Sequence, residues 1–422
     1  MRNKPRIRFK GFTENWEQRK LSELSTMNAR IGWQNLRTSE FLDSGDYLLI
    51  TGTDFDNGRI KYNTCHYVEK KRFDQDTKIQ LSTGSILITK DGTLGKVALV
   101  EELPKPATLN AGVFNVRVKD DAVLSYKYLY HYLKAPFLMK YVTANATGGT
   151  IKHLNQSILV DFPIPITEKQ EQDRIAKLLD SLESIITLHQ RKLEKLKLAK
   201  KALLQKLFPK NGGQFPEIRF KGFTDAWEQR KLGDTNTFFT DGNYGNDYPT
   251  ANEMSDSING VPFLRGSNLD NGAINLMDVH YITKQKHNLL TSGHTKFDDI
   301  IIAVRGSLGN CGYVAKQFID ININSQLAII RTDKNELSGL FLIEYLLSYL
   351  GKKEINRNIT GTALKQLPIN SLKMINIKYP SINEQEKISI LLSKLNTSIT
   401  LHQCKLDKLQ DVKKGLLQKM FV

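Results

Sequence analysis

The sequence predicts an α+β protein with an internal pseudo-twofold repeat, in which two mixed α/β globular regions are each followed by one long helix of coiled-coil type. Three observations support this prediction. Residues 7–21 and 218–232 are identical at 13 of 15 positions. Two helical stretches carry the same heptad pattern, and the regions before them contain matching strand patterns and glycine turns. A duplication on this scale gives every element a counterpart.

The repeated opening segment sets the extent of the duplication. Its copies differ only at Glu14/Asp225 and Asn15/Ala226, and they lie 211 residues apart in a chain of 422 residues. The whole chain therefore reads as two copies of one unit.

Strand patterns follow each opening segment. In residues 47–58 and 261–272 an apolar run leads to Asp-Asn-Gly, which predicts a β-hairpin because Asn and Gly accept positive φ angles. In residues 85–96 and 299–310 a buried strand runs into a Gly-x-x-Gly loop whose polar residues differ between the copies. This pattern indicates a constant scaffold with variable loops.

Each copy continues with a helical pattern, at residues 125–142 and 338–355, and then with a second glycine-containing loop, at residues 145–154 and 358–367.

The long helices are predicted from apolar residues that alternate at spacings of three and four, the pattern of a coiled-coil seam. An amphipathic helix can instead pack on the core of its own domain, but polar residues recur at equivalent seam positions, His189/His402 and Lys200/Lys413, which favours pairing between the two helices. The facing partners of these polar residues stay open. The seam comprises Ile175, Leu179, Leu182, Ile186, His189, Leu193, Leu196 and Leu203, and, 213 residues later, Ile388, Leu392, Leu395, Ile399, His402, Leu406, Leu409 and Leu416.

Composition indicates the kind of partner and the cellular compartment that we expect for this protein. Lys and Arg number 60 and Asp and Glu 44, a net charge of +16 that favours a polyanion such as nucleic acid over a merely basic protein. We expect no membrane segment, because no apolar run approaches the roughly 20 residues of a span. Cys65, Cys311 and Cys404 are widely spaced, as expected of reduced thiols, and we expect a cytoplasmic protein.

The sequence offers no convincing catalytic or metal site. Residues 92–96 approach a phosphate-binding loop, but Val97 stands where a Mg²⁺-binding Ser or Thr is required. His280, His287 and His294 recur every seven residues, yet Gly293 and the following strand pattern argue against a helix face, so no metal is expected. No catalytic motif was found, and we expect the chain not to be an enzyme.

The glycine loops form a candidate DNA-binding constellation. They supply basic and hydroxyl side chains for phosphates and polar side chains for base edges. Any one of these loops could be an ordinary solvated turn, but their paired placement in a basic protein favours DNA. The candidate DNA contacts are Lys90, Asp91, Thr93, Lys96, Lys152, Arg305, Ser307, Asn310 and Lys365.

Together these features resemble the specificity subunits of type I restriction-modification systems. The resemblance rests on the repeated Arg-Phe-Lys-Gly-Phe…Trp-Glu opening, the strand before Gly-[Thr/Ser]-Leu-Gly, the second loop, and the Glu-Gln start of each long helix. It implies target recognition domains at residues 1–166 and 218–380, each reading one half of a bipartite, asymmetric target. It also implies helices at 167–208 and 381–422 that pair antiparallel as a spacer, with a linker at 209–217.

The resemblance further implies partners: double-stranded DNA, two modification subunits that methylate adenine, and two restriction subunits that translocate and cleave DNA. S-adenosylmethionine, ATP and Mg are then expected on those subunits, with no cofactor bound by this chain. Two other classes stay open: a coiled-coil scaffold whose globular halves bind proteins without DNA specificity, and, less favoured by the missing motifs, a self-sufficient nuclease or methyltransferase.

Overall fold

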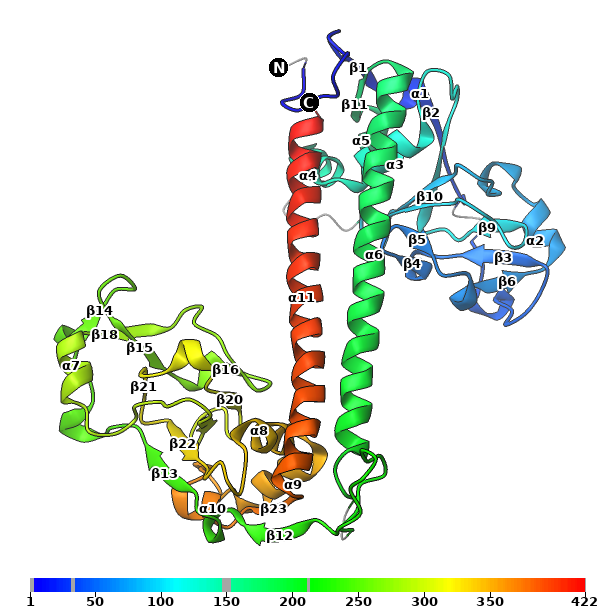
Figure 1. Ribbon diagram of the computed structural model, residues 1–422. Coiled ribbons are helices and arrows are strands. Elements are labelled where there is room, and N and C mark those ends of the chain that lie inside the picture. Colours follow the sequence, from blue (N-terminus) through cyan, green and yellow to red (C-terminus); the bar gives the residue numbers. More distant parts are fainter. Residues whose placement is uncertain (1–3, 32–34, 146–152, 211–212, 422) are drawn as a thin grey trace. The chain divides into compact units, whose positions relative to one another are not determined.

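The protein is described by a computed structural model covering residues 4–31, 35–145, 153–210 and 213–421. It divides into two compact units. Unit 1 comprises Met1–Gln190 and Cys404–Val422, and unit 2 comprises Arg191–Gln403. Each unit contains one globular region and segments of both long helices (Figure 1). The predicted α+β class and internal repeat are confirmed.

Two sheets form the globular region of unit 1. The antiparallel sheet β2-β10-β7-β8 consists of β2 (Ser25–Ala29), β10 (Val113–Val118), β7 (Ile86–Thr89) and β8 (Val97–Leu99). The sheet β6-β3-β9 consists of β6 (His66–Val68), β3 (Tyr47–Ile50) and β9 (Ala107–Leu109), with β3 and β9 parallel. Ile86 and Ile88 of β7 face one core and Leu87 faces another. A strand buried on both faces requires an unbroken apolar run, and β7 has one.

Unit 2 repeats this arrangement with one additional strand, β14. The sheet β13-β22-β19-β20 consists of β13 (Phe238–Asp241), β22 (Leu327–Arg331), β19 (Ile300–Ala303) and β20 (Cys311–Tyr313). The sheet β14-β18-β15-β21 consists of β14 (Met254–Ser255), β18 (His280–Ile282), β15 (Val261–Leu264) and β21 (Asn322–Ile323).

The predicted hairpins are confirmed in both units. One joins β4 (Phe55–Asp56) to β5 (Arg59–Ile60), and the other joins β16 (Leu269–Asp270) to β17 (Ala273–Ile274). The turn residues have positive φ angles, 51° at Asn57 and 87° at Gly58, and 47° at Asn271 and 89° at Gly272. Two successive positive φ angles match the twist of the flanking strands, which explains the Asn-Gly pair.

The helical patterns before the second loops are each two helices rather than one. In unit 1, α3 (Tyr126–Lys134) ends before α4 (Pro136–Asn145), because Pro136 has no backbone N–H and disfavours helical backbone at Ala135. In unit 2, α8 (Gly339–Leu347) gives way to α9 (Tyr349–Asn358), where the Ser348 side chain accepts a hydrogen bond from the Gly351 N–H at 3.2 Å. The short helices are α1 (Leu21–Leu24), α2 (Lys70–Asp74), α5 (Gln156–Val160), α7 (Lys284–Leu289) and α10 (Ile369–Lys373).

The long helices are α6 (Lys169–Lys206) and α11 (Ile382–Met420), and they pack antiparallel within each unit. In unit 1, Ile175 and Leu179 near the start of α6 share a core with Met420 at the end of α11. In unit 2, Leu207 just after α6 shares a core with Leu392 of α11. The residues of the predicted seam are buried or half-buried along both helices. No helix in the described part of the chain is long and apolar enough to cross a membrane.

The ends of the two long helices are exchanged between the repeats. Phe208, at the end of the first repeat, packs in unit 2 against Trp227, Phe341 and Tyr345 with ring centroids 6.0, 5.7 and 5.7 Å away. Phe421, 213 residues later, packs in unit 1 on the side chains that match those three partners. Its ring lies 6.5, 5.4 and 5.2 Å from the rings of Trp16, Tyr128 and Tyr132. Each globular core is therefore completed by the other repeat's helix.

The repeated opening segment is tied to the start of the long helix. Its Glu-Gln-Arg-Lys residues form β1 (Glu17–Lys20) and β12 (Glu228–Lys231), which pair with β11 (Pro163–Ile166) and β23 (Asn376–Tyr379) directly before the helices. The Arg8 guanidinium donates two hydrogen bonds to the Glu171 carboxylate, at 2.8 and 2.9 Å. Arg219 makes the same bidentate contact with Glu384, both at 2.8 Å. The Glu at each helix start is thus a buried anchor for the opening segment.

The two seam lysines reach carboxylates of different elements. In unit 1, Lys413 Nζ lies 2.5 Å from Glu183 Oε1 on α6, and Lys134 of α3 lies 3.0 Å from the same oxygen. In unit 2, Lys200 Nζ lies 3.7 Å from Glu344 of α8, whose other oxygen accepts a hydrogen bond from Asn396 at 2.7 Å. The same lysine position is used in both units. Its acidic partner lies on the long helix α6 in unit 1 and on α8 of the globular region in unit 2.

Replacing Lys413 by Met should destabilise unit 1 by about 1–3 kcal/mol at pH 7, because it removes a cation from Glu183. Burial raises the pKa of Glu183, but Lys134 and Lys413 outweigh it and hold that pKa below its ordinary value. A lowered pKa stabilises the folded state above the unfolded-state pKa, and this stabilisation is lost as pH falls through the folded-state value. The variant should therefore unfold at higher pH in an acid titration followed by circular dichroism. The exposed neighbour Lys414→Met serves as the control, and equal midpoints for both variants would contradict the prediction.

Candidate nucleic-acid interface

The first loop of unit 1, residues 90–96, connects β7 to β8 and is held by its own backbone. The Thr89 hydroxyl donates to the Thr93 carbonyl oxygen and accepts from the Lys96 N–H at 3.0 Å. Gly92 and Gly95 adopt φ angles of 72° and 71°, and a side chain at Gly95 would collide with Met139 of α4. This frame leaves the side chains of Thr93 and Lys96 exposed.

The matching loop of unit 2, residues 304–310, has the same frame. Gly306 and Gly309 have φ angles of 70° and 78°, and a Cβ at Gly309 would lie 2.8 Å from Cγ2 of Ile355 in α9. The Gly309 N–H donates to the Ala303 carbonyl at 2.9 Å. The exposed side chains on this loop are those of Arg305, Ser307 and Asn310.

In each unit the second loop is joined to the first by a backbone hydrogen bond. The Leu154 N–H donates to the Lys90 carbonyl at 2.9 Å, and the Leu367 N–H donates to the Val304 carbonyl at 2.9 Å. In unit 2, Thr360 and Gln366 exchange two backbone hydrogen bonds of 2.9 Å, which closes the loop that carries the exposed Lys365. In unit 2 the two loops therefore form one continuous surface, and in unit 1 the described end of the second loop, residues 153–154, lies against the first loop. We call the described residues of the two loops in each unit the loop pair.

Charged groups on the loop pairs have identifiable partners. In unit 1, His153 Nδ1 lies 2.5 Å from Asp91 Oδ1, which connects the second loop to the first. The Lys90 ammonium group lies 5.6 Å from the centroid of the Phe114 ring. In unit 2, the Arg305 guanidinium lies 5.2 Å from the centroid of the Tyr244 ring. A guanidinium supported by a ring keeps its outer N–H groups available for a phosphate or a guanine edge.

Most of the candidate DNA contacts predicted from the sequence lie on the two loop pairs. Lys90, Asp91, Thr93 and Lys96 share the first loop of unit 1, whereas Lys152 lies outside the described residues. The candidates in unit 2 are Arg305, Ser307, Asn310 and Lys365.

One residue that the sequence did not single out, Tyr244, lies beside the loop pair of unit 2, and two exposed cations lie on the adjoining helix α9. Tyr244 is 39% exposed and belongs to a Gly- and Asn-rich segment at 242–246, a composition that signals a surface turn. Lys352 and Arg357 are exposed on α9, the helix that contacts the loop through Ile355. In the sequence, Lys352 and Arg357 are marked only by the basic pattern at residues 352–357, which is equally typical of a solvated helix face.

The similarity to known proteins extends over nearly the full chain. A family model described as the type I restriction modification DNA specificity domain matches residues 13–198 and 224–411. A putative type I restriction enzyme MjaX specificity subunit from Methanocaldococcus jannaschii is 25% identical over 414 residues, covering 96% of this chain and 92% of the relative. The MjaVIII specificity subunit of the same organism is 23% identical, with 95% of each chain covered. The crystal structure of a type I restriction-modification S subunit from M. genitalium has the same fold, with a TM-score of 0.65, 19% identity and 99% of each chain covered.

Proposed function

Because this chain belongs to the DNA specificity family of type I restriction-modification systems, we propose that each loop pair reads one half of a bipartite, asymmetric DNA target. The chain acts as the DNA sequence-specificity subunit of such a complex. The observation that carries the proposal is the loop pair itself. Its first loop has one backbone frame in both units but different exposed side chains, Thr93 and Lys96 in unit 1 and Arg305, Ser307 and Asn310 in unit 2. Two recognition loops that share a backbone frame but differ in their exposed side chains suit two different half-sites.

We further propose residues 1–166 and 218–380 as the two target recognition domains. The helices within 167–208 and 381–422 would set the spacing between the half-sites, with 209–217 as the linker. Basic side chains on the loops would supply salt-dependent affinity through phosphate contacts, and the polar tips would supply base discrimination.

The chain would not itself be catalytic. In this proposal it docks two modification subunits, which methylate adenine with S-adenosylmethionine, and two restriction subunits, which use ATP and Mg²⁺ on double-stranded DNA. We place it in the cytoplasm, which accords with three free cysteines.

The function is tested by single-molecule sequencing of adenine methylation in cells that contain the modification subunit, with and without this chain. We expect one bipartite motif with unequal halves, methylated only when this chain is present. If methylation occurs without sequence preference or does not depend on the chain, the recognition proposal fails and the protein-binding scaffold gains support.

Single loop substitutions should weaken recognition of one half-site each. Lys96→Ala and Arg305→Ala each remove one exposed cation from a different loop pair, and we expect losses of about 1–3 kcal/mol, or roughly 5- to 150-fold in affinity. The measurement is a gel shift of the assembled methyltransferase on its methylation motif and on versions with either half scrambled. Lys201→Ala, an exposed cation on α6, is the matched control. Equal binding by all three variants would exclude these side chains from the interface.

A further inference from the structure

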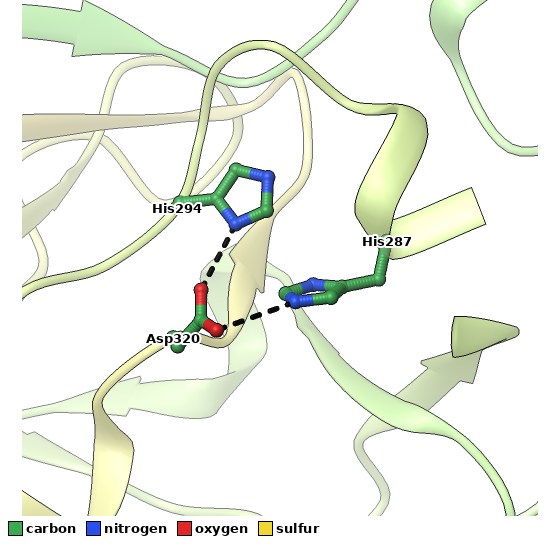
Figure 2. A group of neighbouring side chains, drawn as sticks. All are labelled: His287, His294 and Asp320. Carbon is green, nitrogen blue, oxygen red and sulfur yellow. Dashed lines mark hydrogen bonds and ion pairs between the residues drawn. The ribbon is translucent and has the colours of Figure 1, made fainter. Parts of the chain in front are cut away.

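Two histidines and one aspartate of unit 2 converge on the same point (Figure 2). His287 lies on α7, His294 follows Gly293 in the next loop, and Asp320 precedes β21. Asp320 Oδ1 lies 3.1 Å from His294 Nδ1, and its Oδ2 lies 3.5 Å from His287 Nε2. The three potential ligand atoms all lie within 4.8 Å of one another. The short helix α7 was not expected from the sequence, and it is what brings His287 to this point.

The outer nitrogen of each ring faces an oxygen acceptor. His287 Nδ1 lies 2.5 Å from Asn322 Oδ1, and His294 Nε2 lies 2.9 Å from the Leu290 carbonyl oxygen. The Leu290 carbonyl oxygen only accepts hydrogen bonds, as does Asn322 Oδ1 in this orientation of the amide, so in this arrangement both outer nitrogens carry the proton. In a neutral ring the inner nitrogen, which faces Asp320, then presents a lone pair. This is the arrangement found in metal-ligating histidines, whose second nitrogen donates to an oxygen acceptor.

Neither the doubly neutral nor the doubly protonated form satisfies all three groups, and a single proton leaves the lone pair of one ring nitrogen facing the carboxylate. If both rings are neutral, two lone pairs face the oxygens of one carboxylate. If both are charged, two imidazolium rings lie with centroids 4.6 Å apart beside a single negative charge. A divalent cation between the inner nitrogens and the carboxylate uses both lone pairs and the negative charge together. Ligands about 2.0–2.1 Å from Zn²⁺ in tetrahedral geometry are separated by roughly 3.3–3.5 Å, close to the two distances to Asp320.

We propose that His287, His294 and Asp320 form a zinc site in which a water molecule completes the coordination. The nitrogen-rich ligand set suits Zn²⁺ and related transition metals rather than Mg²⁺ or Ca²⁺. The ion would join α7 and the following loop to β21. The segment after β21 also contacts the loop pair, because the Gln326 carbonyl accepts hydrogen bonds from the N–H groups of Val304 and Arg305, at 2.8 and 3.2 Å. Zinc would thus stabilise the scaffold behind the reading surface of unit 2.

The matching positions of unit 1 lack these ligands. At the repeat offset of 214 residues, the positions equivalent to His287, His294 and Asp320 are Phe73, Gln80 and Pro106, none of which is a usual zinc ligand. The Gln80 side chain instead donates to the Phe73 carbonyl at 3.1 Å. One scaffold therefore carries a metal-binding set in one repeat and an amide hydrogen bond in the other.

The test is zinc binding by the purified full-length chain without a histidine tag. After treatment with a chelator, equilibrium dialysis and elemental analysis should give about one Zn²⁺ per chain, and Co²⁺ should give the visible absorption of a tetrahedral site. Zinc should also raise the thermal midpoint of the protein, whereas Mg²⁺ should not. Binding requires no DNA, so its failure would leave the proposed function untouched.

Variants locate the ion. His294→Ala and Asp320→Asn should each weaken zinc affinity at least tenfold, with circular dichroism in the absence of metal verifying that they fold. His280→Ala, which removes an exposed histidine of β18 from the same unit, should bind zinc as the original protein does. The proposal is overturned if the original protein binds no zinc, if the cluster variants bind it equally well, or if the thermal midpoint responds only to pH.

Discussion

Phe421→Ala is expected to destabilise unit 1 by about 3–5 kcal/mol, although the residue lies next to the last position of the chain. Terminal residues are usually dispensable for folding. Phe421 is an exception because it is 4% exposed and packs among Trp16, Tyr128 and Tyr132. Removing the ring leaves a cavity in a core that the first repeat cannot fill from its own helix.

Hydrogen exchange measured by mass spectrometry can follow each unit separately during urea unfolding. Phe421→Ala should increase exchange in β7 and α3 of unit 1, and Phe208→Ala should do the same in β19 and α8 of unit 2. Val412→Ala, at a residue that is 53% exposed on α11, is the control and should change stability by less than about 0.5 kcal/mol. If Phe421→Ala instead loosened unit 2, the exchanged packing of the helix ends would be incorrect.

Glu171→Ala should cost unit 1 about 3–5 kcal/mol, because it removes one partner of a buried ion pair and leaves the other uncompensated. The Glu171 carboxylate accepts hydrogen bonds from Arg8, from Thr167 and, at 3.2 Å, from Trp16 Nε1. Glu384→Ala should cost unit 2 less. Glu384 holds Arg219 in the same bidentate way, but Trp227 Nε1 makes no hydrogen bond within the described structure.

Urea unfolding followed by circular dichroism measures both losses. Glu168→Ala, at an exposed position three residues earlier, should leave the midpoint unchanged within about 0.5 kcal/mol. A loss at Glu384 that equals or exceeds the loss at Glu171 would show that the additional donors around Glu171 contribute nothing.

Local patterns in the sequence were sufficient for much of this fold. The hairpins at Asn57-Gly58 and Asn271-Gly272, the strands before the glycine loops and the long helices all follow from backbone preference and periodicity over a few residues. The positions of the candidate DNA contacts could be predicted for the same reason, because Gly92, Gly95, Gly306 and Gly309 mark turns that an ordinary side chain would strain. The prediction of one helical stretch was wrong in both units. Pro136 marks the break in unit 1, whereas in unit 2 the apolar pattern continues through Ser348 and only the side-chain cap ends the first helix.

The sequence by itself determined that this protein is a duplication with two glycine-loop scaffolds, two matched long helices and the motifs of its family. Only the tertiary structure decided which repeat each helix end completes. Phe208 and Phe421 occupy equivalent positions, so either could fill either aromatic core, and the antiparallel packing of α6 and α11 within each unit selects the exchanged arrangement. Tertiary structure likewise paired Lys413 with Glu183 and brought His287 and His294 to Asp320. These contacts join residues far apart in the chain, and periodicity carries information only about near neighbours.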